Sequence, residues 1–212
     1  MNNNGLNQQQ QEAVEYIGGP LLVLAGAGSG KTRVITQKIA WLVREAEIPA
    51  RNILAVTFTN KAAREMKNRV GELLDRRLAR GLKVSTFHQL GLTILRSELG
   101  AAGLKAGFTL LDEQDTTPLV KELLKQNDNE RASLVRWQIS AWKNAMLTPE
   151  EALAAAGDAA THQAASIYTD YERSLRAYNA VDFDDLIWLP VRLFEQHPEV
   201  LEKWQSRLRY ML

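Results

Sequence analysis

The chain has 212 residues, of which 45% are hydrophobic and 24% are charged, and it contains 13 Gly, 6 Pro and no Cys. This composition excludes a disordered or collagen-like chain, and the lack of Cys excludes disulfides, thiolate zinc sites and cysteine nucleophiles. No segment approaches the ~18 consecutive apolar residues that span a bilayer, and the polar start lacks the apolar run of a signal peptide. We therefore expect a cytoplasmic protein without a membrane partner.

The formal net charge of +1 hides two opposed segments. Residues 60–83 carry eight basic and three acidic side chains, a local charge of +5, whereas residues 144–202 carry three basic and eleven acidic ones, a local charge of −8. A basic segment of this kind is typical of a surface that binds a polyanion, but it also describes an ordinary solvated helix face. Charge alone leaves both interpretations open.

The first ninety residues alternate short apolar runs with segments of helical periodicity. The apolar runs predict strands over residues 21–25, 53–58 and 84–87. The periodic segments predict helices over residues 31–45, 60–78 and 88–99. Buried strands joined by helices predict an α/β fold with a parallel sheet.

Beyond Gly100 the pattern becomes helical, which predicts an all-helical inserted subdomain. We expect helices over residues 116–126, 132–144 and 149–178, then a helix capped by Asp182 and a strand over 207–212. Core packing is expected for Trp137, Trp142, Trp188 and Trp204. The predicted domains are a first core part at 1–90, the helical insertion at 91–180 and a return to the core at 181–212. Because a domain rarely ends on a strand with nothing after it, we expect a core that is incomplete at its C-terminus.

Residues 25–32 read Ala-Gly-Ala-Gly-Ser-Gly-Lys-Thr, between the first predicted strand and the first long predicted helix. This fits the P-loop pattern with Ala in place of the first Gly, although a glycine-rich turn is the bland alternative. Backbone N–H groups and the helix dipole would hold phosphate, Lys31 would bridge the β- and γ-phosphates of ATP, and Thr32 would ligate Mg²⁺. The predicted nucleotide-binding residues are Ala25, Gly26, Ala27, Gly28, Ser29, Gly30, Lys31, Thr32 and Arg33, with Lys31 and Thr32 as the catalytic pair.

Four further segments resemble, in order and spacing, the motifs of superfamily 1 DNA helicases of the Rep, UvrD and PcrA type. Leu6-Asn7-x-x-Gln10-x-x-Ala13 resembles the adenine-reading Q motif, residues 57–63 resemble motif Ia, residues 85–88 resemble motif Ib, and residues 182–187 resemble the segment that re-enters the core. The resemblance covers nearly all of the chain and is strongest for Rep-like helicases. It implies a P-loop NTPase (RecA-like) core that uses ATP and Mg²⁺ and moves 3′ to 5′ along single-stranded DNA. A parent helicase would also act on partially duplex DNA, in replication or repair.

The resemblance assigns Gln10 to the adenine and a second set of residues to DNA. The DNA set is Thr57, Phe58, Thr59, Asn60, Thr86 and His88. A carboxamide can both donate to and accept from an adenine edge, and an aromatic ring at the carboxyl end of a parallel strand can stack a base. Each assignment has a local alternative: Asn7 with Gln10 forms a capping box, Phe58 is a core residue, and His88 merely starts a helix.

The run Leu110-Leu111-Asp112-Glu113 superficially resembles a strand that ends in the acidic pair of a Walker B motif. It also opens a predicted helix, where acids serve as caps. The helicase family carries its hydrolytic acids in a motif that would follow Leu212, so we expect this chain to bind nucleotide without turning it over. Two other classes stay open: a self-contained P-loop ATPase or kinase that uses Asp112 and Glu113, and a module that binds DNA without ATP.

Overall fold

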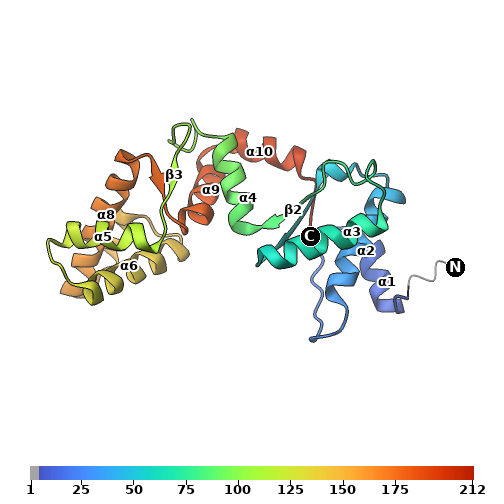
Figure 1. Ribbon diagram of the computed structural model, residues 1–212, viewed down its shortest axis with the longest axis horizontal. Coiled ribbons are helices and arrows are strands. Elements are labelled where there is room, and N and C mark those ends of the chain that lie inside the picture. Colours follow the sequence, from blue (N-terminus) through green and yellow to red (C-terminus); the bar gives the residue numbers. More distant parts are fainter. Residues whose placement is uncertain (1–4) are drawn as a thin grey trace. The chain divides into compact units, whose positions relative to one another are not determined.

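The computed structural model describes residues 5–212, which form two compact units (Figure 1). The first unit contains the described residues up to Phe87 together with Glu202–Leu212, and the second contains His88–Leu201. The boundaries expected from the sequence were 90/91 and 180/181, so residues 181–201 lie in the helical unit instead. They do so because Val181 and Leu186 form a buried cluster with Leu95 of that unit. Within residues 5–212, no helix is both long and apolar enough to cross a bilayer.

The first unit is built on a parallel sheet in the order β2-β1-β5. Its strands are β1 (Ile53–Thr57), β2 (Lys83–Thr86) and β5 (Tyr210–Met211). β1 pairs with β2 in a register that places Thr57 opposite Thr86, and it pairs with β5 from Ile53 opposite Tyr210. The first three residues of β1 are fully buried, as expected for a central strand in a parallel sheet. The predicted α/β class with a parallel sheet is therefore confirmed.

In the described part of this unit, three α-helices and a short 3₁₀-helix lie wholly within the segment up to Phe87. They are α1 (Gln8–Glu15), α2 (Lys31–Arg44), η1 (Ala50–Asn52) and α3 (Asn60–Leu73). The apolar stripe of α2, with Ile39 and Leu42, packs against Ile53 of the sheet and Val70 of α3. The helix predicted over 60–78 ends earlier because Leu74 turns extended and buried.

Residues 21–25 do not form the predicted strand. The backbone is not part of any ladder, and Leu22 and Leu24 are 82% and 87% exposed. An apolar run becomes a strand only if a neighbouring strand takes its hydrogen bonds, and the described sheet contains β2, β1 and β5 alone. A cavity of about 340 Å³ is lined by Leu21 and Val23 on one side and by Tyr210–Leu212 on the other. The segment leading into the glycine-rich loop is therefore extended without being part of the sheet.

The second unit is mainly helical, but it is not all-helical as predicted, because β3 (Thr109–Leu110) and β4 (Ala180–Val181) form a small parallel ladder. The helices are α4 (Phe87–Ser97), α5 (Glu113–Leu124), α6 (Asn129–Asn144), α7 (Pro149–Ala154), α8 (Ala159–Ala177), α9 (Asp185–Gln196) and α10 (Pro198–Arg207), the last of which contains the division between the units. The helix predicted over 149–178 is two helices, because Asp158 caps α8 and accepts a hydrogen bond from the Thr161 N–H.

A buried ion cluster joins α6, α8 and α9 in the helical unit. The Lys143 ammonium lies 2.7 Å from Glu172, 2.8 Å from Asp182 and 2.7 Å from Asp185, and the Lys143 side chain is fully buried. The Tyr171 hydroxyl donates a 3.0 Å hydrogen bond to the same Asp182 carboxylate. The Asp182 carboxylate also accepts from the Asp185 N–H at 2.8 Å, although the N-cap of α9 is Asp184 and not the predicted Asp182.

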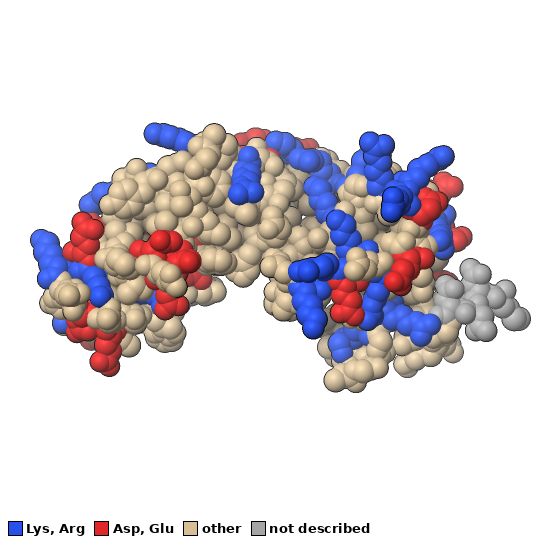
Figure 2. All heavy atoms as spheres, in the orientation of Figure 1, with Lys and Arg blue, Asp and Glu red and all other residues tan. Residues whose placement is uncertain are grey.

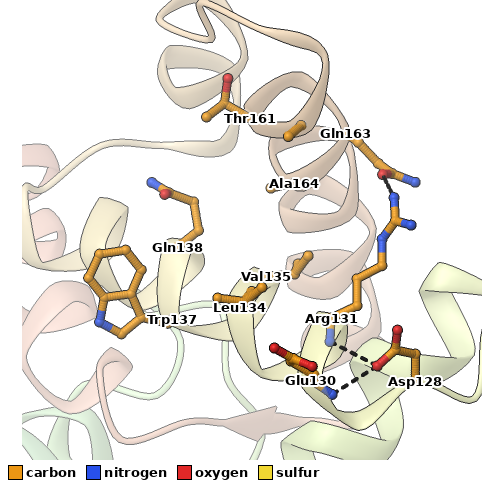
Figure 3. A pocket seen from close by; sticks show the side chains of 11 residues that line it. Asp128, Glu130, Arg131, Leu134, Val135, Trp137, Gln138, Thr161, Gln163 and Ala164 are labelled. Atoms are coloured by element: carbon orange, nitrogen blue, oxygen red, sulfur yellow. Dashed lines mark hydrogen bonds between the residues drawn. The ribbon is translucent and has the colours of Figure 1, made fainter.

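Trp142, Trp188 and Trp204 are buried, as expected, but Trp137 is 68% exposed. Trp137 and Leu134 lie on α6 beside a cavity of about 500 Å³, whose far side is formed by the start of α8 near Thr161 and Ala164 (Figure 3). The expectation of core packing is therefore wrong for Trp137. Trp142, five residues further along the same helix, instead stacks on Tyr168 with ring centroids 6.0 Å apart.

Candidate nucleotide and nucleic-acid sites

The glycine-rich loop of residues 25–30 runs directly into α2. Gly28 and Gly30 have φ angles of 76° and 85°, a left-handed conformation that glycine adopts without the strain a side chain would bring. Gly30 is the N-cap of α2, and this 14-residue helix directs its free N–H groups and the positive end of its dipole toward the loop. A Cβ placed on Gly26 or Gly28 would meet no atom within 4 Å, so the space beside these two glycines is open. These are the requirements of an anion site.

Lys31 places a positive charge on this loop. Its ammonium donates hydrogen bonds to the carbonyls of Ala25, at 3.0 Å, and Gly26, at 2.5 Å. The Ser29 hydroxyl also donates to the Gly26 carbonyl, at 2.7 Å. The Lys31 ammonium therefore lies against the backbone of the glycine-rich loop.

Thr32 and Arg33 follow on the first turn of α2, and both are exposed. The Thr32 hydroxyl is a hard oxygen ligand of the kind that Mg²⁺ prefers. Over residues 5–212 there is no cluster of three His, Asp or Glu side chains suited to hold a metal ion. A single hydroxyl fits Mg²⁺ well, because Mg²⁺ keeps several waters and takes its other ligands from substrate phosphates.

Gln10 lies against the glycine-rich loop although 19 residues separate it from Ser29. Its carboxamide oxygen accepts from the Asn7 N–H at 2.9 Å, and the Asn7 side chain accepts from the Gln10 N–H. The capping box that the sequence offered as an alternative is thus present. The other end of the carboxamide donates to the Ser29 carbonyl at 3.0 Å. The structure brings Gln10 to the loop, and its role toward adenine stays a prediction.

A cavity of about 680 Å³ lies beside α1 and the loop. Its lining includes Gln10, Ala13, Tyr16, Ser29 and Lys31. Its volume is in the range of small-molecule sites. Tyr16 is 43% exposed and was not among the predicted site residues. Its only signal in the sequence is an aromatic residue at the end of the helix that carries Gln10.

The carboxyl ends of β1 and β2 present a second candidate site. Phe58 follows β1 and is 88% exposed, so the alternative of a core residue is wrong. Its ring lies 5.8 Å from the ring of Phe87, which follows β2 and is 41% exposed. Thr59 and Asn60 continue into α3, and the Thr59 hydroxyl accepts from the Ala62 N–H as the N-cap. Two exposed aromatic rings at the ends of adjacent parallel strands form a platform suited to bases.

The other predicted DNA residues are placed differently. Thr57 and Thr86 are paired across the two strands, but Thr86 is only 6% exposed, so it offers little surface to a ligand. The neighbouring Phe87, which is not among the predicted DNA-binding residues, is exposed at this end of β2 instead. His88 belongs to the helical unit, where its ring lies 6.0 Å from the exposed ring of Phe183.

The basic segment 60–83 forms the outer face of α3 and the turn after it. Ala63, Met66 and Val70 face the core, whereas the charged side chains face solvent. Figure 2 shows basic side chains gathered over this part of the first unit, with a few acidic ones among them. The exposed basic residues are Lys61, Arg64, Lys67, Arg69, Arg76, Arg77 and Arg80. Arg69 is paired with Glu65, and the rest give the surface its positive charge.

Asp112 and Glu113 are engaged in the helical unit. The Asp112 carboxylate caps α5 by accepting from the N–H groups of Gln114 and Asp115, at 2.7 and 3.2 Å. Glu113 forms an ion pair with Arg136. These contacts agree with the interpretation of the two acids as the start of a helix, and the partners in them all lie within the helical unit.

Comparison with known proteins places this arrangement in a family. Residues 6–212 match the model of the UvrD/REP helicase N-terminal domain. The chain belongs to this family. The match contains the glycine-rich loop, Gln10 and the Phe58–Phe87 platform, so the resemblance seen in the motifs is confirmed over almost the whole chain.

Individual relatives of this UvrD/REP chain are named as helicases. The chain is 52% identical over 210 residues to the ATP-dependent DNA helicase Rep of Escherichia coli (strain K12), an alignment that covers 98% of this chain and 31% of that protein. It is 42% identical over 215 residues to the ATP-dependent DNA helicase PcrA of Staphylococcus aureus (strain Mu50 / ATCC 700699), covering 98% of this chain and 29% of PcrA. The chain thus spans less than a third of the length of these relatives and corresponds to their N-terminal part.

Proposed function

We propose that this chain is the N-terminal, ATP-binding part of an ATP-dependent DNA helicase that moves 3′ to 5′ along single-stranded DNA. The observation that carries the proposal is the glycine-rich loop at the N-terminus of α2, with the Lys31 ammonium on the loop and Gln10 beside it. ATP dependence and DNA helicase activity are in the names of the relatives. The direction of movement rests on the family resemblance alone. In this proposal the first unit is the P-loop core and the second is the helical insertion.

In the proposed nucleotide site, the loop is a P-loop and each of its groups has a role. The free N–H groups at the start of α2 bind phosphate oxygens, and the helix dipole adds to the attraction. Lys31 leaves the Ala25 and Gly26 carbonyls and binds the β- and γ-phosphates, where it offsets negative charge. Thr32 would hold Mg²⁺, which neutralises phosphate charge when bound. Gln10, whose carboxamide can both donate to and accept from a base, would bind an adenine edge and so favour ATP over GTP.

The proposed DNA site is the platform of Phe58 and Phe87 with the basic face of α3. Base stacking on the two rings is tolerant of sequence, as a moving helicase requires. The polar groups of Thr57, Thr59 and Asn60 lie where the strand and helix meet and can hold phosphate oxygens. The exposed Lys and Arg side chains of α3 attract the DNA backbone through its charge.

We further propose that this chain alone binds ATP but does not hydrolyse it. Asp112 caps α5 and Glu113 pairs with Arg136, both within the helical unit, which supports a structural role for these two acids. Glu12 is the one acid among the residues that line the cavity next to the loop, and it accepts from Gln8 on its own helix. In this proposal none of these three acids drives hydrolysis.

The test is calorimetric titration of ATP with Mg²⁺ into the chain and into Lys31→Ala. Lys105→Ala, an exposed lysine in the helical unit, serves as the matched control. We expect Lys31→Ala to weaken ATP binding by about tenfold or more, because a charge-assisted contact to phosphate contributes about 1.5–3 kcal/mol. The control should bind like the wild type. Equal affinities of the wild type and Lys31→Ala would overturn the proposed site.

A further inference from the structure

Lys38 lies two helical turns after Lys31 on α2, and its side chain is turned into the protein. The residue is 9% exposed. Its ammonium donates hydrogen bonds to the carbonyls of Ala13, at 3.0 Å, Val14, at 3.2 Å, and Tyr16. These carbonyls belong to the C-terminal turn of α1, where helices have acceptors without intrahelical partners. Lys38 thus caps α1 from a neighbouring helix, and its charge complements the negative end of the α1 dipole.

Joining two helices through a buried ammonium costs free energy of folding. Burial lowers the pKa of Lys38, which reflects the cost of keeping its charge away from water. Within residues 5–212, no carboxylate forms an ion pair with it, and the three carbonyls are its partners. An apolar side chain could fill the same space, but it would leave these carbonyls unsatisfied and the C-terminus of α1 free to shift.

The other end of α1 is fastened to the loop itself. Gln10, in the first turn of α1, donates to the Ser29 carbonyl at 3.0 Å. The helix is therefore held at its first turn by the loop and at its last turn by Lys38. The cavity of about 680 Å³ lies along α1 between these attachments, with Gln10 and Tyr16 on the α1 side and Ser29 and Lys31 on the loop side. The position of α1 sets the distance between the two sides.

We infer that Lys38 is a positioning residue for base selection: by fixing the C-terminus of α1, it holds Gln10 at the distance from the loop that a bound adenine requires. Lys38 itself does not line this cavity. The inference rests on the proposed ATP site and adds the element that makes the site selective. It predicts that loss of Lys38 lowers affinity for the base and leaves affinity for the phosphates intact.

Three probes separate these contributions: ATP, GTP and inorganic tripolyphosphate, each with Mg²⁺. In the proposed site, the phosphate chain would contact the loop alone, whereas the base of ATP would also reach α1. We expect Lys38→Met to weaken ATP binding by about tenfold, because the loss of the hydrogen bonds from the charged ammonium changes the geometry of the base site. Tripolyphosphate affinity should stay within about twofold of wild type, and the ratio of ATP to GTP affinity should fall. Lys38→Arg, which keeps the cation and its donors, should retain most of the ratio.

A double-mutant cycle with Gln10→Ala distinguishes positioning from general destabilisation. If Lys38 acts through Gln10, the double variant should lose no more selectivity than Gln10→Ala alone. Additive losses would overturn the inference, and so would an unchanged ATP-to-GTP ratio in Lys38→Met. An equal loss for ATP and tripolyphosphate would also overturn it, because that is the signature of a merely structural role.

The design keeps the inference and the proposed function apart. If the wild type binds ATP no more tightly than tripolyphosphate, the proposed adenine site fails. If the wild type is selective and Lys38→Met is equally selective, only the role of Lys38 fails. If Lys38→Met does not give the wild-type circular dichroism spectrum, Lys38→Gln is used in its place. The shorter, uncharged amide reaches fewer of the carbonyls, so we expect the same order of effects for this variant.

Discussion

Replacing Lys143 by Met should strongly destabilise the helical unit. The Lys143 side chain is fully buried and lies within 2.8 Å of three carboxylates whose side chains are 10% exposed or less. Burial disfavours the Lys143 charge, but Asp185, Asp182 and Glu172 together outweigh burial and raise its pKa well above 10.5. Met has a similar length, so the main change is the loss of charge. Removing one member of a buried ion pair typically costs about 3–5 kcal/mol, here because Asp182 and Glu172 would lose their cation.

The assay is urea unfolding followed by far-UV circular dichroism and tryptophan fluorescence. The two compact units need not unfold together, so the transitions are fitted separately. Arg173→Met is the matched control: it removes a cation from a surface pair with Asp170 in which the Arg173 side chain is 74% exposed. Such a pair contributes about 0–1 kcal/mol. A loss in Lys143→Met no larger than in Arg173→Met would refute the view that the buried cluster holds α6, α8 and α9 together.

Two further predictions follow from the same geometry. Burial raises the pKa of Asp185 to about 8 from its ordinary 3.8, although Lys143 opposes the shift, so between these values the folded chain binds more protons than the unfolded chain. Stability of the helical unit should therefore fall as the pH rises from about 4 to 8. The melting temperature of Asp185→Asn should fall less over this pH range, and an equal change of melting temperature with pH in the two proteins would contradict the prediction. Phe58→Ala should weaken binding of a single-stranded oligonucleotide by about 1–3 kcal/mol without changing its salt dependence, whereas Arg64→Ala should reduce the salt slope. An unchanged titration of Phe58→Ala would remove that ring from the DNA site.

Local patterns in the sequence predicted most of the local structure. The helix expected over residues 31–45 is found and ends at Arg44, and the glycine-rich loop lies at its start. Both features were predictable because each depends on residues that are neighbours in the sequence. The strand predicted over residues 21–25 is not found. An apolar composition indicates a tendency toward burial, but it does not show whether a partner strand is present. Spacing along α6 likewise did not separate the buried Trp142 from the exposed Trp137.

The contacts that the sequence did not predict join residues far apart in the chain. Lys143 meets Asp182 and Asp185 across 39 and 42 positions, and Lys38 meets the end of α1 across more than 20. A lysine at such a position resembles any solvent-facing lysine until the fold surrounds it. Phe87 was overlooked for a related reason: its value as a partner for Phe58 depends on the pairing of β1 with β2.

The central claim is that the glycine-rich loop binds ATP and that these 212 residues do not hydrolyse it. The direct test measures ATP binding and steady-state ATP hydrolysis on the same preparation, with and without a single-stranded oligonucleotide, in the wild type and in Lys31→Ala. The account predicts binding that Lys31→Ala weakens and no turnover in either protein. Absence of binding in the wild type, or turnover that disappears in Lys31→Ala, would contradict it.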